Sequence, residues 1–243
     1  NLLCIVAASL PNSLVAADID AVLQQTSVKG GLVVHLGCKD DQNVSLNKSF
    51  MYHGLNTDAA QVEGLRKRIK SAGHYGRISA AIHTGKRLPY ADNMVNLLIV
   101  EDTLNVSREE MMRVVVPNGF IALKAGKAWK TEQKPRPQEM DEWPQWLHGP
   151  DNVLVSKDQL VGPPRRLKWR ASPNWSRMHN DITVPTSANV ILAANGRLFY
   201  DSDLGFPDSD KMPHRFILSC RDAFNGKLLW KKNLKEWYDG IEY

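Results

Sequence analysis

Small and polar residues follow the apolar runs in the first half of the sequence, where their types could serve a nucleotide-type cofactor. Gly37 and Cys38 come directly after the segment LVVHL, and Asn56 and Asp58 come at the end of FMYHGL and shortly after it. A glycine at such a turn lets the backbone approach a ligand closely. Two interpretations stay open for the first segment. It is the strand and turn of a cofactor site, or it is a buried strand that ends in glycine, with Cys38 packed as a small apolar side chain.

Other side chains that could do chemistry lack a productive spacing. His35 and His53 fall inside apolar runs and His83 lies near the end of one, and none has a second metal-ligating residue at the usual spacing. The serines lack the setting of a nucleophile elbow. The sequence therefore predicts neither a metal site nor a serine nucleophile.

Composition and charge argue against a nucleic-acid partner. The 243 residues are 43% hydrophobic and 23% charged, which is typical of a globular chain with a packed core. The net charge of +5 divides into +2 over residues 1–126 and +3 over 127–243, and the two signs are interleaved. A nucleic-acid interface needs its basic residues clustered on one face. We therefore expect no nucleic-acid binding.

The first residues favour export. Residues 1–17 are apolar, uncharged and end in Val15-Ala16-Ala17, a small-residue pattern of the signal-peptidase type. The run is too short for a membrane span. We interpret it as the tail of an export signal and expect a location in the periplasm or cell envelope, with a buried N-terminal helix as the alternative. The cysteines do not settle the redox compartment.

Residues 18–126 predict an α/β domain. Strand-like runs alternate with helix-like stretches, and parallel strands need such crossover connections. In the stretch 59–73, Val62, Leu65 and Ile69 recur at helical spacing. The expected architecture is a Rossmann-like parallel sheet covered by helices. Ligands of such sheets bind at the carboxyl ends of the strands.

The second half of the chain changes character twice. Residues 127–183 are rich in proline and tryptophan, which predicts a connector. Residues 184–243 predict antiparallel strands, because Asn195-Gly196 and Asn225-Gly226 are two-residue hairpin signals between apolar runs. Two hairpins alone cannot bury their apolar faces, so we expect the chain to be a fragment of a longer protein.

The α/β region resembles the class I S-adenosylmethionine-dependent methyltransferases. Four pieces carry the resemblance in the family's order: LVVHLGC (32–38), HGLNTD (53–58), RLPYADNMVNLLIVED (87–102) and MMRVVVPNGFIAL (111–123). The resemblance implies S-adenosylmethionine as cofactor, bound at the ends of the first two strands. By position it implies these cofactor-binding residues: Gly37, Cys38, Asn56, Asp58, Gly85 and Glu101. Glu101 and Asp102 are also candidates to face the unknown methyl acceptor, while no catalytic residue is assigned.

The sequence departs from the family pattern at three cofactor contacts. The first turn lacks the second glycine of G-x-G and continues as Lys39-Asp40. Asn56 stands where the family has an acidic ribose ligand, with Asp58 two residues further on, and Thr84-Gly85 stands where an aspartate is common. The resemblance therefore implies the fold together with a weakened cofactor site.

A second resemblance concerns residues 220–234. The segment CRDAFNGKLLWKKNL is similar to the repeat that closes each blade in β-propellers of the pyrroloquinoline-quinone type. In that family the glycine makes the turn and the tryptophan, here Trp230, packs between blades. The resemblance implies that a propeller begins at about residue 184, as in large exported bacterial proteins. The quinone cofactor itself is not implied by one blade.

These observations lead to three functional hypotheses. The first is an S-adenosylmethionine-dependent methyltransferase-like protein, whose cofactor site is either working or degenerate. The alternative is a non-catalytic exported scaffold that binds a protein or carbohydrate partner through the propeller. A weaker alternative is a quinone-dependent dehydrogenase completed by further blades.

Overall fold

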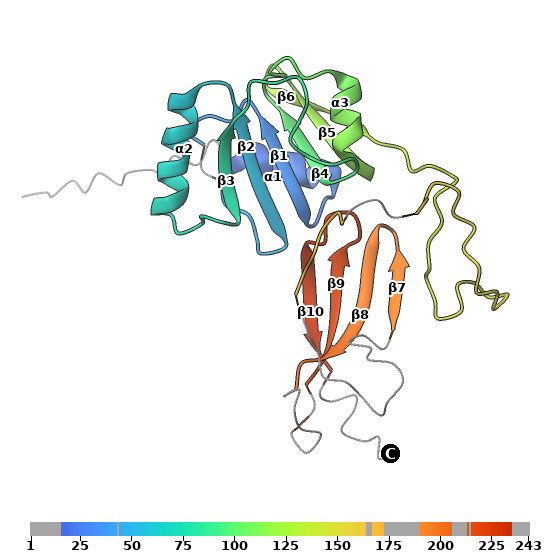
Figure 1. Ribbon diagram of the computed structural model, residues 1–243. Coiled ribbons are helices and arrows are strands. Elements are labelled where there is room, and N and C mark those ends of the chain that lie inside the picture. Colours follow the sequence, from blue (N-terminus) through green and yellow to red (C-terminus); the bar gives the residue numbers. More distant parts are fainter. Residues whose placement is uncertain are drawn as a thin grey trace, which may run out of the picture.

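The computed structural model describes residues 16–42, 44–163, 167–172, 190–205, 213 and 215–234. These residues form two β-sheets, the first flanked by helices and the second standing below its lower edge in Figure 1. The strands of the first sheet are β1 (Gly31–Leu36), β2 (Phe50–Asn56), β3 (Ile78–Ile82), β4 (Val95–Val100), β5 (Val115–Ala125) and β6 (Ala128–Gln133). The strands of the second are β7 (Ile191–Ala194), β8 (Arg197–Asp203), β9 (Phe216–Asp222) and β10 (Leu228–Asn233).

The first sheet has the strand order β3-β2-β1-β4-β5-β6. Its first five strands are parallel, and β6 pairs antiparallel with β5. The direction in which successive strands are added reverses between β1 and β4, which makes this the switch point where open α/β sheets bind ligands. The predicted Rossmann-like parallel sheet is thus confirmed.

Three helices cover the two faces of this sheet. Helix α1 (Ala16–Thr26) and helix α2 (Ala59–Ser71) share one apolar core, to which α2 contributes Val62, Leu65 and Ile69, as its spacing predicts. Helix α3 (Arg108–Val114) packs in the other core. Because side chains alternate along β1, this strand feeds both cores. The sheet is therefore buried on both faces, as parallel sheets require.

Two predicted boundaries need correction. The helix-like segment SREEMMRVVV (107–116), one of those that alternate with strand-like runs, is helical only as far as Val114, and Val115 already pairs with Val95 as the start of β5. The connector expected from residue 127 begins later, because residues 128–133 form β6. Gly126, at φ 63°, turns the chain back after β5, so that Ala125 pairs with Ala128. The polar sequence AWKTEQ is compatible with a half-exposed edge strand. Because it lacks an apolar run, its sequence pattern predicts part of the connector instead.

The second sheet is an antiparallel meander in the order β10-β9-β8-β7. Asn195 and Gly196 both have positive φ, at 51° and 68°, and join β7 to β8 as predicted. The two-residue turn predicted at Asn225-Gly226 is wrong. A longer loop joins β9 to β10, because the Asp222 carboxylate accepts bonds from the amides of Phe224 and Asn225 and extends the turn.

The connector contacts the second sheet rather than running free. Trp143 forms a two-bond antiparallel bridge with Ala193 of the edge strand β7. Asp141 holds the connector itself together by accepting bonds from His148, Ser156 and the amide of Lys157. The exposed edge of β7 is thereby partly covered.

The expected export-signal segment 1–17 lies outside the described residues, except for Ala16 and Ala17, which begin α1. In the described part of the chain, no helix combines the length and apolar character that crossing a bilayer demands.

Candidate functional site

A small cavity lies at the carboxyl edge of the first sheet, beside the ends of β1 and β4. Its volume is about 310 Å³. It is lined by residues at or just after the carboxyl ends of four strands, namely Gly37, Lys39, Asn56, Glu101, Asp102 and Lys124. Of the six residues that the resemblance assigns to the cofactor, Gly37, Asn56 and Glu101 are thus brought together, whereas Cys38, Asp58 and Gly85 do not line the cavity.

Gly37 allows the carboxyl ends of β1 and β4 to approach each other closely. Its φ is +79°, and a Cβ at this position would lie 2.7 Å from the backbone nitrogen of Asp102. The amides of Glu101 and Asp102 both point to the carbonyl oxygen of Leu36, at 3.0 and 3.4 Å. The glycine therefore serves a close approach of β1 and β4 to each other, at the position where the resemblance expects an approach to a ligand.

Cys38 belongs to the apolar core rather than to the cavity. It is fully buried beside Gly54, whose added Cβ would lie 2.7 Å from the Cys38 sulfur. Burial raises the pKa of the Cys38 thiol to about 12. The cofactor role expected for this side chain is therefore replaced by the alternative role, that of a small core residue.

Asn56 and Asp58 shape the loop around them. The Asn56 amide donates to the carbonyl oxygen of Cys38 at 2.6 Å and accepts from the amide of Asp58 at 2.9 Å. Asp58 is the N-cap of α2 and accepts from the amide of Ala60 at 2.8 Å. Its exposed carboxylate points to the helix end and does not line the cavity.

Gly85 lies in an exposed loop away from the cavity. The atom nearest to an added Cβ there is 3.8 Å away, on the His83 ring. No positive φ or close contact requires a glycine at this position. The structure therefore gives Gly85 no part in the candidate site.

Glu101 is the centre of a half-enclosed polar network that combines five side chains. Its carboxylate lies 3.5 Å from Nε2 of His35 and 3.3 Å from Nζ of Lys124, and it accepts from Gln42 at 3.2 Å. The other nitrogen of the His35 ring, Nδ1, lies 2.9 Å from the Tyr52 hydroxyl. Burial disfavours the charged form of Glu101, but His35 and Lys124 outweigh this effect and lower its pKa to about 2. Glu101 is thus a fixed anion already neutralised within the chain.

Sequence reasoning missed Lys124 and the partners of Glu101. Lys124 is the penultimate residue of β5, so a search at the carboxyl ends of all five parallel strands would have selected it. Gln42 and Tyr52 carried no such signal, because nothing in the sequence pairs Gln42 with Glu101, 59 positions away, or Tyr52 with His35, 17 positions away. Among the described residues, no group of three His, Cys, Asp or Glu side chains could hold a metal ion.

The chain matches no protein-family model and no curated protein. Similar solved structures include a SAM dependent methyltransferase from Aquifex aeolicus, with 17% identity, a TM-score of 0.40, and 49% of this chain and 72% of that chain covered. A geranyl diphosphate C-methyltransferase from Streptomyces coelicolor A3(2), in complex with S-adenosyl-L-homocysteine, has 15% identity and a TM-score of 0.38, with 44% of each chain covered. The cyclase SpnF has 20% identity and a TM-score of 0.37, with 45% of this chain and 46% of that chain covered. This chain thus spans less than half the length of the last two proteins.

Proposed function

We propose that residues 16–133 form a class I S-adenosylmethionine methyltransferase-like domain that transfers no methyl group and serves as a scaffold for the antiparallel sheet. The family resemblance of the four sequence pieces supports the first part. These pieces fall on β1 with its turn, on the end of β2, on the segment into β4, and on α3 with β5. They thus occupy the strands on both sides of the switch point.

The carrying observation is that most polar side chains in the lining of the carboxyl-edge cavity already bond within the chain, either to backbone groups or to another side chain. Asn56 holds the loop after β1, Asp102 accepts from the amide of Leu104, and Glu101 is paired with Lys124. Within the part of the chain that the structure describes, Lys39 is the one side chain of this lining without a hydrogen bond or ion pair. Each bond that a ligand would have to displace costs affinity. The groups present therefore do not fit S-adenosylmethionine in the way that the resemblance would place it.

Calorimetric titration of the whole chain with S-adenosylmethionine tests the proposal. We expect no heat of binding at millimolar cofactor, and a dissociation constant below about 1 mM would contradict the scaffold role. The double substitution Lys39→Gly with Asn56→Asp provides the second arm. Binding gained by this variant would indicate an eroded pocket that is still open, whereas no gain is expected if internal bonds close it.

A second candidate function, methyl transfer at a working site, is favoured by the cavity itself. It lies at the switch point, and its volume of about 310 Å³ is at the lower end of the range of roughly 300–1,000 Å³ found for ligand pockets. The same titration separates the two candidates, because only a working site binds the cofactor without substitution.

We also propose that β7–β10 form one blade of a β-propeller and that the protein is exported. Propeller blades are four-stranded antiparallel sheets, and the repeat-like residues 222–230 cover the end of β9, its loop and part of β10. Gly226, at φ 74°, leaves room there for the Trp169 ring. An exported location suits a scaffold better than an enzyme that consumes a cytoplasmic cofactor. Further D-A-x-x-G-K-x-x-W units in the full reading frame are expected, and their absence would contradict the propeller.

A further inference from the structure

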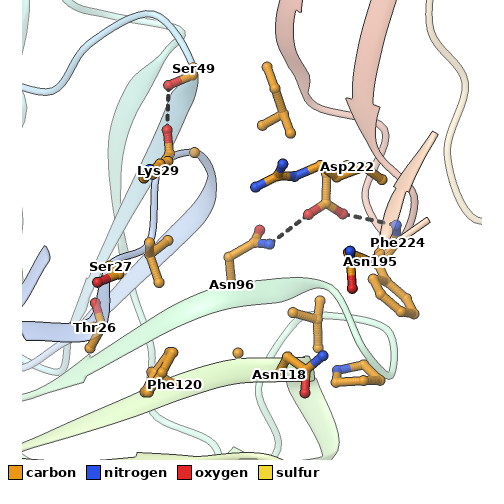
Figure 2. Close-up of a pocket in the computed structure, with 18 of the residues that line it drawn as sticks. Thr26, Ser27, Lys29, Ser49, Asn96, Asn118, Phe120, Asn195, Asp222 and Phe224 are labelled. Carbon is orange, nitrogen blue, oxygen red and sulfur yellow. Dashed lines mark hydrogen bonds between the residues drawn. The ribbon is translucent and has the colours of Figure 1, made fainter. Parts of the chain in front are cut away.

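A second cavity, of about 320 Å³, lies at the opposite edge of the first sheet. It is a half-open cavity between the amino ends of β1, β4 and β5 and the turns of the second sheet (Figure 2). Figure 2 shows Lys29 and Ser49 on one side, Asn195, Asp222 and Phe224 on the other, and Asn96 between them. Both sheets therefore contribute walls to this interdomain cavity.

A tight polar contact fixes the two walls relative to each other. The Asn96 amide donates to the Asp222 carboxylate at 2.6 Å and accepts from the Asn225 side chain at 2.8 Å. The same oxygen of Asn96 accepts from the amide of Leu32 at 2.8 Å. Gly31, at φ +106°, makes room for this amide, because an added Cβ would lie 2.0 Å from it. The contact is therefore built into both β1 and β4, and the cavity has a defined shape.

The cavity carries positive charge that the described chain does not neutralise. Lys29 and Arg197, one from each domain, line it, and neither side chain has a hydrogen bond or ion pair among the described residues. The acidic residue in the lining is Asp222, which is 5% exposed and already accepts from Asn96, Phe224 and Asn225. An anionic ligand would find two cations here and one carboxylate that is already bonded.

The remaining lining combines free amides with aromatic rings. The side chains of Asn118 and Asn195 make no hydrogen bond within the described residues, and each offers both a donor and an acceptor. Phe224 lines the wall, and Trp230 lines it with 43% of its surface exposed. Paired donors and acceptors suit neighbouring hydroxyl groups, and an aromatic face suits the C–H face of a pyranose ring.

We propose that this interdomain cavity binds an acidic sugar, with its carboxylate between Lys29 and Arg197 and its hydroxyls on Asn118 and Asn195. The proposal does not depend on the cofactor site, which lies at the opposite edge of the sheet. It gives the proposed scaffold a ligand class. Because both sheets contribute contacts, a bound sugar stabilises their docked arrangement.

Calorimetric titration of the whole chain with D-glucuronate tests the proposal, with D-glucose and inorganic sulfate as comparison ligands. We expect saturable binding of glucuronate, weaker binding of glucose and weaker binding of sulfate. Arg197→Gln is expected to weaken glucuronate binding by about tenfold or more, and Arg197→Lys to retain most of it. Arg197 is exposed, so these variants are expected to fold.

A matched control is Arg108→Gln, which changes an exposed arginine paired with Glu132 far from this cavity. It is expected to leave glucuronate binding unchanged. Three outcomes would overturn the proposal: no glucuronate binding at about 10 mM, equal binding of sulfate, or equal losses in the Arg197→Gln and Arg108→Gln variants. Failure here leaves the S-adenosylmethionine titration unaffected, so the two proposals fail separately.

Discussion

The two edges of the α/β sheet use their polar residues in opposite ways. At the carboxyl edge, where such sheets bind ligands, Asn56 and Glu101 bond within the chain. At the amino edge, Asn96 docks the second sheet, while Lys29 and Arg197 stay without partners in the described residues. The two linings differ in how much of them is bonded within the chain. Among the described residues, Lys39 is the side chain without a partner at the carboxyl edge, whereas both cations of the amino-edge lining lack one. Bonding within the chain and position in the fold must therefore be judged together when a ligand site is sought.

The largest expected effect concerns the glycine that closes the carboxyl edge. Gly37→Ala places a Cβ 2.7 Å from the backbone of Asp102 at a φ of +79°. Left-handed strain and the clash together are expected to lower the free energy of unfolding by about 4 kcal/mol. Urea denaturation measures this loss. Gly85→Ala is the control, because the nearest atom there is 3.8 Å away, and a change within about 0.5 kcal/mol is expected. An equal loss of unfolding free energy in both variants would contradict the claim that β1 and β4 require a glycine at position 37.

The next effect is the acid sensitivity of the carboxyl-edge network. Because His35 and Lys124 hold the pKa of Glu101 at about 2, below its ordinary value of 4.5, this side chain is expected to stabilise the fold fully above about pH 4.5. The stabilisation, up to about 3 kcal/mol, is lost as the pH falls through about 2. The free energy of unfolding, measured across this pH range, should therefore change less with pH in Glu101→Gln than in the unmodified chain.

The matched control for this pH series is Glu139→Gln, an exposed glutamate of the connector. Its profile is expected to follow that of the unmodified chain. A Glu101→Gln profile that also follows it would contradict the internal neutralisation of Glu101.

A smaller effect is expected at the amino edge. Asp222→Ala removes the acceptor of Asn96 and of two backbone amides, which is expected to cost about 2 kcal/mol. Hydrogen exchange should accelerate at Phe224 and Asn225 while β1 stays protected. Asp158→Ala is the control, because Asp158 holds a similar turn in the connector without a bond to the first sheet. Exchange that accelerates equally throughout β1 would show that the two sheets unfold as one unit.

The smallest effect is expected for Lys124→Met, which removes one of the partners of Glu101 at the cavity. The remaining contacts to His35 and Gln42 limit the cost to about 1 kcal/mol at neutral pH. The pKa of Glu101 should rise, which NMR titration of its carboxyl carbon measures. An unchanged pKa of Glu101 would contradict the claim that Lys124 stabilises its charged form.

The sequence was sufficient to locate most helices and strands, but it did not show which side chains from distant elements bond to one another. Periodicity located α2, and the run of buried residues located β1, because burial leaves a pattern in consecutive residues. The resemblance also led to four residues that line the carboxyl-edge cavity, namely Gly37, Asn56, Glu101 and Asp102. It could not show that Asn56 bonds to the carbonyl of Cys38, because that depends on the loop conformation and not on residue type. The contact of Asn96 with Asp222 joins residues 126 positions apart and left no local signal.

This separation also has a consequence during synthesis of the protein. Asn96 is synthesised 126 residues before Asp222. At typical translation rates the amino edge of the first sheet is therefore exposed for roughly 6 to 25 seconds before the residue that contacts it is made. The first domain can fold in that interval with Asn96 still hydrated. A nascent chain halted before residue 222 should therefore offer this edge to chaperones, and one that has cleared it should not.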